Sequence, residues 1–120
     1  MASYTKLLQV SKETYNEVLK RDEGCLFCKL DYHMHPKFPN ILDCMILDAM
    51  HYIPKSSMGL GRPENLVIGC RYHHHLLDNG NKGLRAEMLR MMTKYLKNLY
   101  PKWDKNKLTY KKWGEYYGKK

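Results

Sequence analysis

The hydrophobic pattern of the chain changes along its length, from helical stripes near both ends to short apolar runs in the middle. The first stripe predicts a helix over residues 11–21, with Ser11 as the N-cap, because a serine before an apolar-periodic segment can bond to the free N–H groups of the first turn. Its apolar face consists of Val10, Tyr15, Val18 and Leu19. Residues 1–10 show no such period, and we expect them to have little regular structure.

A longer stripe predicts a second helix over about residues 84–99, which Pro101 ends. Spacing of three and four residues between apolar positions is typical of a helix face buried in a core rather than of a cofactor site, even where methionines contribute to it. The positions are Leu84, Met88, Met91, Met92, Tyr95, Leu96 and Leu99.

The middle of the chain alternates between short apolar runs and segments rich in turn residues. Residues 41–53 predict a strand or hairpin that Asp43 and Asp48 interrupt. Residues 31–40 and 54–64 each contain two prolines, and both are predicted to be loops.

A short helix is predicted to begin just after Cys70 and to end at Asn79-Gly80. Helices beside a short strand region indicate an α+β fold, and 120 residues are the length of a single domain. We expect one domain over residues 1–120, with a core of about 22–80, an N-terminal helix of about 11–21, and a basic, aromatic C-terminal helix and tail of 81–120.

Charge is distributed unevenly along the chain. Residues 1–80 hold nine Lys/Arg and nine Asp/Glu, whereas residues 81–120 hold twelve Lys/Arg and three Asp/Glu, so the last third carries the whole net charge of +9. Lysines interleaved with aromatic residues suit a nucleic-acid backbone, where cations displace counterions and rings pack on sugars or bases. The alternative is a solvated, lysine-rich surface that only aids solubility. The aromatic residues are Tyr95, Tyr100, Trp103, Tyr110, Trp113, Tyr116 and Tyr117.

The sequence offers no pattern that would place the chain in or across a membrane. No apolar run approaches the roughly 20 residues of a membrane-spanning helix, and no signal-peptide pattern follows Met1. The short Cys25-x2-Cys28 spacing favours thiolates on a metal over disulfides, which indicates a reducing compartment. We therefore expect a soluble, cytoplasmic protein without a membrane partner.

Two short-spaced pairs of metal-ligand residues, far apart in the sequence, predict a structural zinc site. Thiolate and imidazole ligands suit tetrahedral Zn²⁺, and such an ion can supply much of the folding free energy of a small domain. Two alternatives remain open: His74 or His75 can replace His73, and Cys44 can be a ligand instead of a core residue, as which we expect it. The expected ligands are Cys25, Cys28, Cys70 and His73.

A second set of polar residues follows once His73 is assigned to zinc. His74 and Asp78 lie four residues apart, so on a helix they share one face and can bind one ion. Such a ligand pair suits a hard divalent ion, Mg²⁺ or Mn²⁺ above all. His51 lies at the end of the predicted strand, and Asn65 could accept its imidazole N–H and leave the other ring nitrogen free as a base.

These segments together resemble the HNH endonucleases of the ββα-metal (His-Me finger) type, in particular the compact, zinc-stabilised members that occur as stand-alone proteins in bacteria and their phages. The resemblance covers roughly residues 10–82 and, more weakly, the segment from Tyr100 to Tyr110. It implies a core of two antiparallel strands and a helix around one divalent ion, hydrolysis of DNA phosphodiesters, and a bacterial or phage-infected cell. The matching elements are Cys25-x2-Cys28, His51-Tyr-Ile-Pro-Lys-Ser, Gly59-Leu-Gly61, Glu64-Asn65-Leu66, Cys70-x2-His73-His74 and Asp78-Asn-Gly.

The resemblance also implies a role for each residue of the motif. His51 becomes the general base that takes a proton from the attacking water, and the ordinary imidazole pKa of about 6.5 suits that task. Asn65 would orient His51 and tighten the loop. His74 becomes a ligand of the catalytic ion, and Asp78 a further ligand one helical turn on.

One position departs from the family pattern. Met50 stands where many members have a metal-binding Asp, Glu or His, and a thioether is a poor ligand for a hard ion. Asp48 lies on the same side of an extended strand as Met50, so it is the expected substitute ligand, directly or through water.

The sequence as a whole predicts a metal-dependent DNA endonuclease with a structural zinc ion and a catalytic divalent ion. Two other functions compete with it: a non-catalytic, zinc-stabilised DNA-binding module, and an accessory factor that acts through a protein partner in a phage packaging or defence complex. The residues expected to contact DNA are Lys55, Arg62, Lys102, Lys105, Lys107, Lys111 and Lys112.

Overall fold

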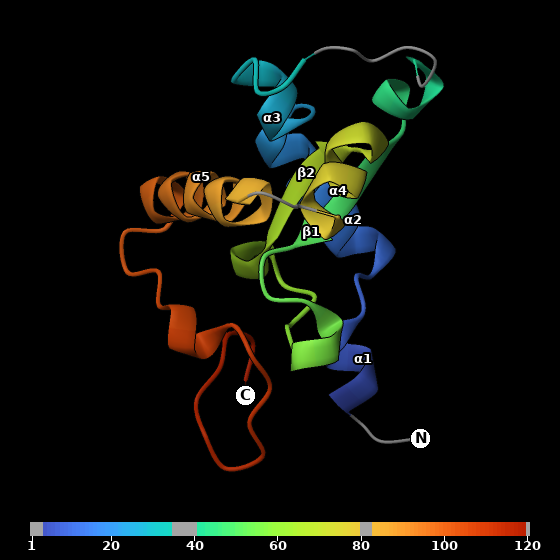
Figure 1. The fold of residues 1–120 in the computed structure, drawn as a ribbon. Coiled ribbons are helices and arrows are strands. Elements are labelled where there is room, and N and C mark those ends of the chain that lie inside the picture. The colour runs from blue at the N-terminus through green and yellow to red at the C-terminus, as the bar shows by residue number, and fades with distance from the viewer. Residues whose placement is uncertain (1–3, 35–40, 80–82, 120) are drawn as a thin grey trace.

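A two-stranded antiparallel sheet lies at the centre of the computed structural model, which describes residues 4–34, 41–79 and 83–119 (Figure 1). Strand β1 (Leu47–His51) pairs with β2 (Leu66–Cys70) in a register that runs from Leu47 opposite Cys70 to His51 opposite Leu66. The fold is therefore a small α+β structure. The helices around the sheet are α1 (Tyr4–Leu8), α2 (Lys12–Asp22), α3 (Leu26–Lys29), α4 (Arg71–Asp78) and α5 (Leu84–Leu99), with 3-10 turns η1 (Ile41–Met45), η2 (Lys55–Ser57), η3 (Pro63–Asn65) and η5 (Lys105–Lys107).

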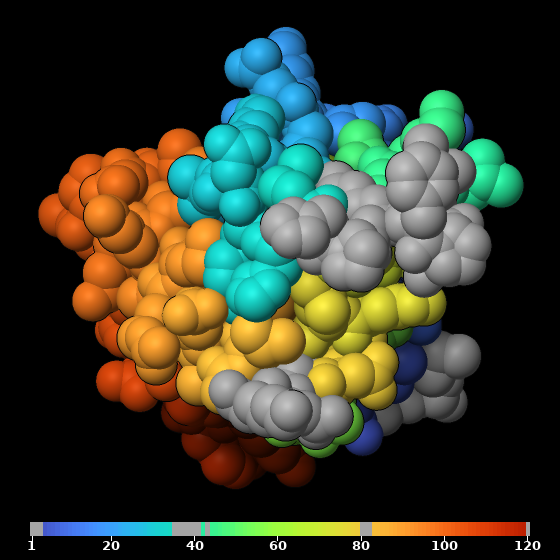
Figure 2. Space-filling model, turned by 45° about the horizontal axis from the view of Figure 1, so that its top comes forward, coloured from blue at the N-terminus to red at the C-terminus, as the bar shows by residue number. Residues whose placement is uncertain are grey.

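Helices cover both faces of the sheet and bury β2 completely. On one face, Val18 of α2 packs with Leu66 and Ile68 of β2. On the other face lies the larger core, to which α3, α4 and α5 contribute, and their surfaces adjoin on one side of the molecule (Figure 2). Its most deeply buried side chains include Phe27, Met50, Val67, Leu77, Met88, Met92, Leu96 and Leu108.

A buried carboxylate joins the two helices of longest span to the sheet. Asp22, at the end of α2, is only 2% exposed and accepts hydrogen bonds from the Ile68 amide (2.8 Å) and the Tyr95 hydroxyl (2.5 Å). Arg21 pairs with the same carboxylate at 2.6 Å and also donates to the carbonyls of Pro63 and Leu66. Because every buried polar atom here has a partner, the network fixes β2 against α2 and α5 instead of destabilising the core.

The helical predictions are confirmed. Helix α2 begins after Ser11, whose Oγ accepts the Thr14 amide at 3.0 Å, and α5 spans the predicted residues 84–99. The short helix also begins directly after Cys70 and is followed by Asn79.

Two other predictions need correction. The expectation that residues 1–10 have little regular structure is wrong, because Tyr4–Leu8 form α1 and Leu8 is buried. The strand or hairpin predicted over residues 41–53 is confirmed only in part, since a 3-10 turn occupies Ile41–Met45 and strand β1 covers Leu47–His51 without a break at Asp48. Of the predicted loop over residues 31–40, residues 35–40 lie outside the described part of the chain.

Among the described residues, no helix is both long and apolar enough to cross a membrane.

Candidate metal centre and the adjoining cavity

Three cysteines and one histidine converge where β2 passes into α4. Cys25 is the N-cap of α3, and its Sγ accepts the amide of Cys28 at 3.4 Å. Cys70 ends β2 and caps α4, which places His73 one turn further on beside it. One donor atom from each of the four residues lies within 4.8 Å of the other three.

The spacing of the four donor atoms is that of a tetrahedral zinc site. Zinc bond lengths of about 2.3 Å to sulfur and about 2.0 Å to nitrogen place two sulfurs about 3.8 Å apart, and a sulfur and a nitrogen about 3.5 Å apart. Cys28 Sγ and Cys70 Sγ are 3.8 Å apart. His73 Nδ1 lies 3.6 Å from the sulfurs of Cys25 and Cys28 and 3.2 Å from that of Cys70. The Cys3His cluster can therefore hold a metal ion.

Hydrogen bonds around the cluster favour the forms of its side chains that bind a cation. Nε2 of His73 lies 2.6 Å from the Tyr32 carbonyl, which can only accept, so the proton sits on Nε2 and the lone pair of Nδ1 faces the sulfurs. The hydrogen bond from Cys70 lowers the pKa of Cys25 to about 3 against the opposing effect of burial, with a smaller contribution from His73. The same contact raises the pKa of Cys70. The contact between the two cysteines thus favours the thiolate form of Cys25, the form that metal binding requires.

The alternative zinc ligands are not part of this cluster. His74 is directed to Asp48, His75 is exposed on α4, and Cys44 lies on η1 outside the group of four. The assignment of His73 agrees with the sequence prediction.

The second predicted group, on the far side of α4, is brought together in a different arrangement. His74 Nδ1 lies 2.9 Å from Oδ2 of Asp48, and His74 Nε2 lies 3.6 Å from Oδ2 of Asp78. The imidazole therefore stands between the two carboxylates. Asp48 also accepts from Arg71 at 3.1 Å, and although burial alone would raise its pKa, the hydrogen bonds from Arg71 and His74 outweigh burial and hold the pKa below its usual value.

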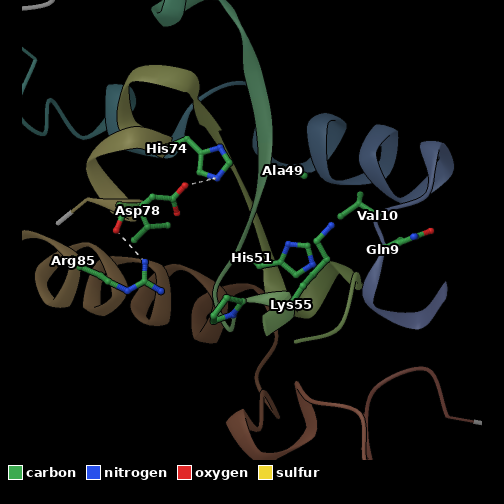
Figure 3. A pocket seen from close by; sticks show the side chains of 10 residues that line it. Gln9, Val10, Ala49, His51, Lys55, His74, Asp78 and Arg85 are labelled. Carbon is green, nitrogen blue, oxygen red and sulfur yellow. Dashed lines mark hydrogen bonds and ion pairs between the residues drawn. The ribbon is translucent and has the colours of Figure 1, made fainter. Parts of the chain in front are cut away.

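His74 and Asp78 line a cavity of about 570 Å³ that also contains His51 (Figure 3). The cavity is bounded by β1, α4, the start of α5 and the segment between α1 and α2. Lys55 and Arg85 bring two cations to it. Arg85 was not predicted from the sequence. It donates a hydrogen bond to the Leu77 carbonyl at 2.9 Å, and no local motif reveals this contact between two helices.

His51, at the end of β1, is half-buried and is turned toward Gln9 and Val10 (Figure 3). Its Nε2 lies 3.0 Å from the Leu8 carbonyl, which requires the proton on Nε2. Burial lowers the pKa of His51, and the nearby charges of Lys55 and His74 act in the same direction against the hydrogen bond to Leu8. These effects favour the neutral form of the ring, which carries its lone pair on Nδ1.

The imidazole N–H of His51 is bonded to the Leu8 carbonyl and not to Asn65, contrary to the prediction that Asn65 accepts it. Asn65 Oδ1 accepts the Ile53 amide at 2.8 Å, and its Nδ2 donates to the carbonyls of Ile53 (3.0 Å) and Leu60 (2.8 Å). Both N–H groups are thus used within the loop that follows β1. These bonds tighten the loop, as predicted. The His51 ring is bonded to a backbone carbonyl instead of to Asn65.

Met50 is a core residue. Its side chain is 0% exposed and packs toward Gly69 on β2, where a Cβ atom would lie 2.4 Å from the Met50 methyl carbon. Asp48 and Met50 share one face of β1, as predicted, but only Asp48 reaches the polar group on α4.

The basic residues expected to contact DNA occupy several environments rather than one continuous row. Lys55 belongs to the cavity of His51, whereas Lys102 and Lys105 line a separate cavity of about 540 Å³ with Tyr52 and Trp103. The others have partners of their own: Arg62 pairs with Glu64 at 3.8 Å, Lys111 donates to Asn106 and Thr109, Lys112 lies 5.2 Å from the Trp113 ring, and Lys107 lines a third cavity with Tyr117.

Comparison with models of protein families, with curated proteins and with solved structures finds no match to this chain.

Proposed function

We propose that this protein is a metal-dependent endonuclease of the HNH type that hydrolyses phosphodiester bonds of DNA. The observation that carries the proposal is the half-buried His51, whose Nε2 donates to the Leu8 carbonyl and leaves Nδ1 as the basic nitrogen, in the same cavity as the His74–Asp78 pair. The resemblance of the sequence motifs to HNH enzymes supports it, as do the antiparallel pair β1–β2 and helix α4, the elements a ββα-metal core requires.

In the proposed reaction, His51 Nδ1 accepts a proton from a water molecule as that water attacks the phosphorus atom. The leaving group is the 3′ oxygen of the broken ester. Lys55 and Arg85 lie in the same cavity and attract the phosphate, and Arg85 is held in place by its bond to Leu77. Asn65 keeps the loop after β1 closed, which holds Lys55 near His51.

The divalent ion would be held by His74 Nε2 and Asp78 Oδ2, whose separation of 3.6 Å suits two ligands of one ion. Asp48 lies behind His74 and would orient its ring and strengthen it as a ligand, rather than bind the ion itself, because its Oδ2 faces Nδ1. When bound, the ion would stabilise the negative charge that develops on the phosphate and on the leaving oxygen.

The test is cleavage of supercoiled plasmid by zinc-loaded protein with Mg²⁺, Mn²⁺ or other divalent ions. Wild type is expected to nick or cut, and His51→Ala and His74→Ala are each expected to lose about 100-fold or more in rate. His75→Ala is the matched control, since His75 is exposed on the same helix and is expected to leave cleavage unchanged. Cleavage by His51→Ala at the wild-type rate would exclude the proposal.

A non-catalytic DNA-binding module is the second candidate, and burial of Met50 favours it because the position that supplies a metal ligand in many HNH enzymes faces the core instead. DNA binding without cleavage in any metal would support this candidate. Cleavage only after addition of a partner protein would instead indicate the accessory factor.

A further inference from the structure

The segment before α2 makes a specific contact with the proposed base. Leu8, the last residue of α1, is 7% exposed, and its carbonyl lies 3.0 Å from His51 Nε2. Because a carbonyl oxygen can only accept, this contact fixes the proton on Nε2. Within the described residues, Nδ1 of His51 has no hydrogen-bond partner, so its lone pair is free.

Gly61 holds this segment close to the loop after β1. Its amide donates to the Leu7 carbonyl at 2.8 Å. A Cβ atom at position 61 would lie 2.0 Å from the Gln9 carbonyl oxygen and 3.0 Å from that of Leu8. Only glycine allows two backbones to approach this closely, so any larger residue must push the segment away from its position beside His51.

The C-terminal tail holds the other end of α1. The Tyr4 ring stacks on that of Tyr110, with centroids 5.3 Å apart and planes inclined by 27°. Tyr110 is itself fixed, because its amide donates to the Met58 carbonyl at 3.0 Å and its ring packs against Tyr116 at 5.5 Å. The segment is thus secured on both sides of Leu8, by Gly61 and by the Tyr4–Tyr110 stack.

We propose that residues 4–10, named here the N-terminal arm, are a positioning element that holds His51 in the Nε2-protonated tautomer through the Leu8 carbonyl. The consequence for catalysis rests on the proposed endonuclease function, whereas the tautomer can be observed whether or not the protein cleaves DNA. Release of the arm leaves the ring free to sample both tautomers and other orientations, so fewer molecules present Nδ1 to the cavity.

The experiment uses full-length, zinc-loaded protein labelled with ¹⁵N at histidine, and it reads the two ring nitrogens of His51 by NMR. Wild type is expected to show a single Nε2–H tautomer with a slowly exchanging proton. Gly61→Ala and Tyr4→Ala are expected to shift the ¹⁵N signals toward a mixture of tautomers and to speed proton exchange. The matched control is Tyr4→Phe, which keeps the stack and is expected to resemble wild type.

Plasmid cleavage measured on the same samples tests the consequence for catalysis. Release of the arm is expected to lower kcat by about tenfold with little change in KM, because the base and not the DNA contacts is affected. Unchanged His51 signals in both Gly61→Ala and Tyr4→Ala would overturn the proposal. If Gly61→Ala does not fold, the Tyr4→Ala and Tyr4→Phe pair decides alone.

The two proposals fail in different ways. Suppose that the tautomer is fixed in wild type and released in the variants, but that the protein never cleaves DNA. This result would support the positioning element and exclude the endonuclease. Normal cleavage by variants whose tautomer is released would overturn the role of the arm and leave the endonuclease intact.

Discussion

Two imidazoles in this protein have their tautomers set by carbonyls from distant parts of the chain. Tyr32 accepts from Nε2 of His73, and Leu8 accepts from Nε2 of His51, so both rings keep the lone pair on Nδ1. In His73 that nitrogen faces the three sulfurs, and in His51 it belongs to a ring that lines the cavity. The same local chemistry thus leaves a lone pair on Nδ1 of both rings, which suits metal binding in His73 and, in the proposed reaction, acceptance of a proton by His51.

Met50 provides a test of side-chain direction on β1. Met50→Asp would introduce the kind of ligand that many HNH enzymes have at this position, but it would place a carboxylate in a fully buried site beside Gly69. We expect it to destabilise the protein by about 4 kcal/mol or more, measured by urea unfolding, because the charge would lie in the hydrophobic cluster that surrounds Met50 among the described residues. Met50→Leu, which conserves volume, should cost less than about 1.5 kcal/mol.

A folded Met50→Asp protein with tighter Mn²⁺ binding than wild type would contradict this expectation. It would show that the side chain at position 50 can turn toward the ion. In that variant, the carboxylate of β1 nearest to the ion would not be that of Asp48.

At the scale of single residues, sequence reasoning succeeded where the relevant contacts are local. The choice of His73 over its two neighbours follows from Cys-x2-His spacing on a single helical turn, and the cluster confirms it. The contact of His51 with Leu8 joins two distant segments and has no signal in the sequence, and the tightening of the loop by Asn65 was an implication of the family resemblance, not of local spacing.

At the scale of elements, α4 connects the metal cluster to the cavity. Successive residues of a helix are about 100° apart, so His73 faces the sulfurs while His74 faces Asp48 on β1. An ion in the cluster would fix the first turn of α4 to α3 and to the end of β2. The position of His74 therefore depends on the integrity of the Cys3His cluster.

Loss of the metal is expected to unfold this region rather than to impair the cavity alone. Cys28→Ser should lower the zinc content well below one ion per chain and lower the Tm by about 10 °C or more, since metal binding supplies folding free energy to a small domain. Cys44→Ser is the matched control and should keep both the zinc and the Tm, because Cys44 lies outside the cluster.

A strong chelator should reproduce the effect of Cys28→Ser in wild type, with zinc release and the fall in Tm followed on the same sample. The assignment would be wrong if Cys28→Ser kept its zinc, or if removal of zinc left the Tm unchanged.

The elements that sequence patterns predicted are those with one buried face. Helix α5 has such a face in Met88, Met92 and Leu96, and its bounds were predicted to the residue. Strand β2 is buried on both faces, so it lacks the alternation that marks a strand, and its pairing was an implication of the family resemblance alone. Helix α1 has five residues and owes its order to Gly61 and Tyr110, which no local pattern reveals.

At the scale of the whole molecule, the basic tail is fixed to the loop after β1 instead of extending into solvent. Leu108 is fully buried and its carbonyl accepts the Leu60 amide at 2.9 Å, while Thr109 forms a β-bridge with Gly59. The excess charge of the last third of the chain therefore has a defined position relative to the cavity of His51. The uneven charge was evident in the sequence, but this attachment requires contacts about fifty residues apart.

If DNA binds to this surface, its affinity must depend on salt according to the number of phosphates that the tail neutralises. Each neutralised phosphate contributes about −0.9 to the slope of log K against log salt concentration. Lys102 and Lys105 lie together beside Tyr52 and Trp103, so the double change Lys102→Gln/Lys105→Gln should weaken binding and reduce the magnitude of the slope by about 1 to 2.

The matched control removes the same charge from the balanced part of the chain, as Lys6→Gln/Lys20→Gln, at two exposed lysines that line none of the described cavities. Fluorescence anisotropy with a short labelled duplex, titrated at several salt concentrations, measures both slopes. Long-range attraction alone would weaken binding equally in the two double variants, since they have the same net charge. A change of slope only in the Lys102/Lys105 variant would instead identify this cavity as a place where phosphates make direct contact, because counterion release counts contacts and not total charge.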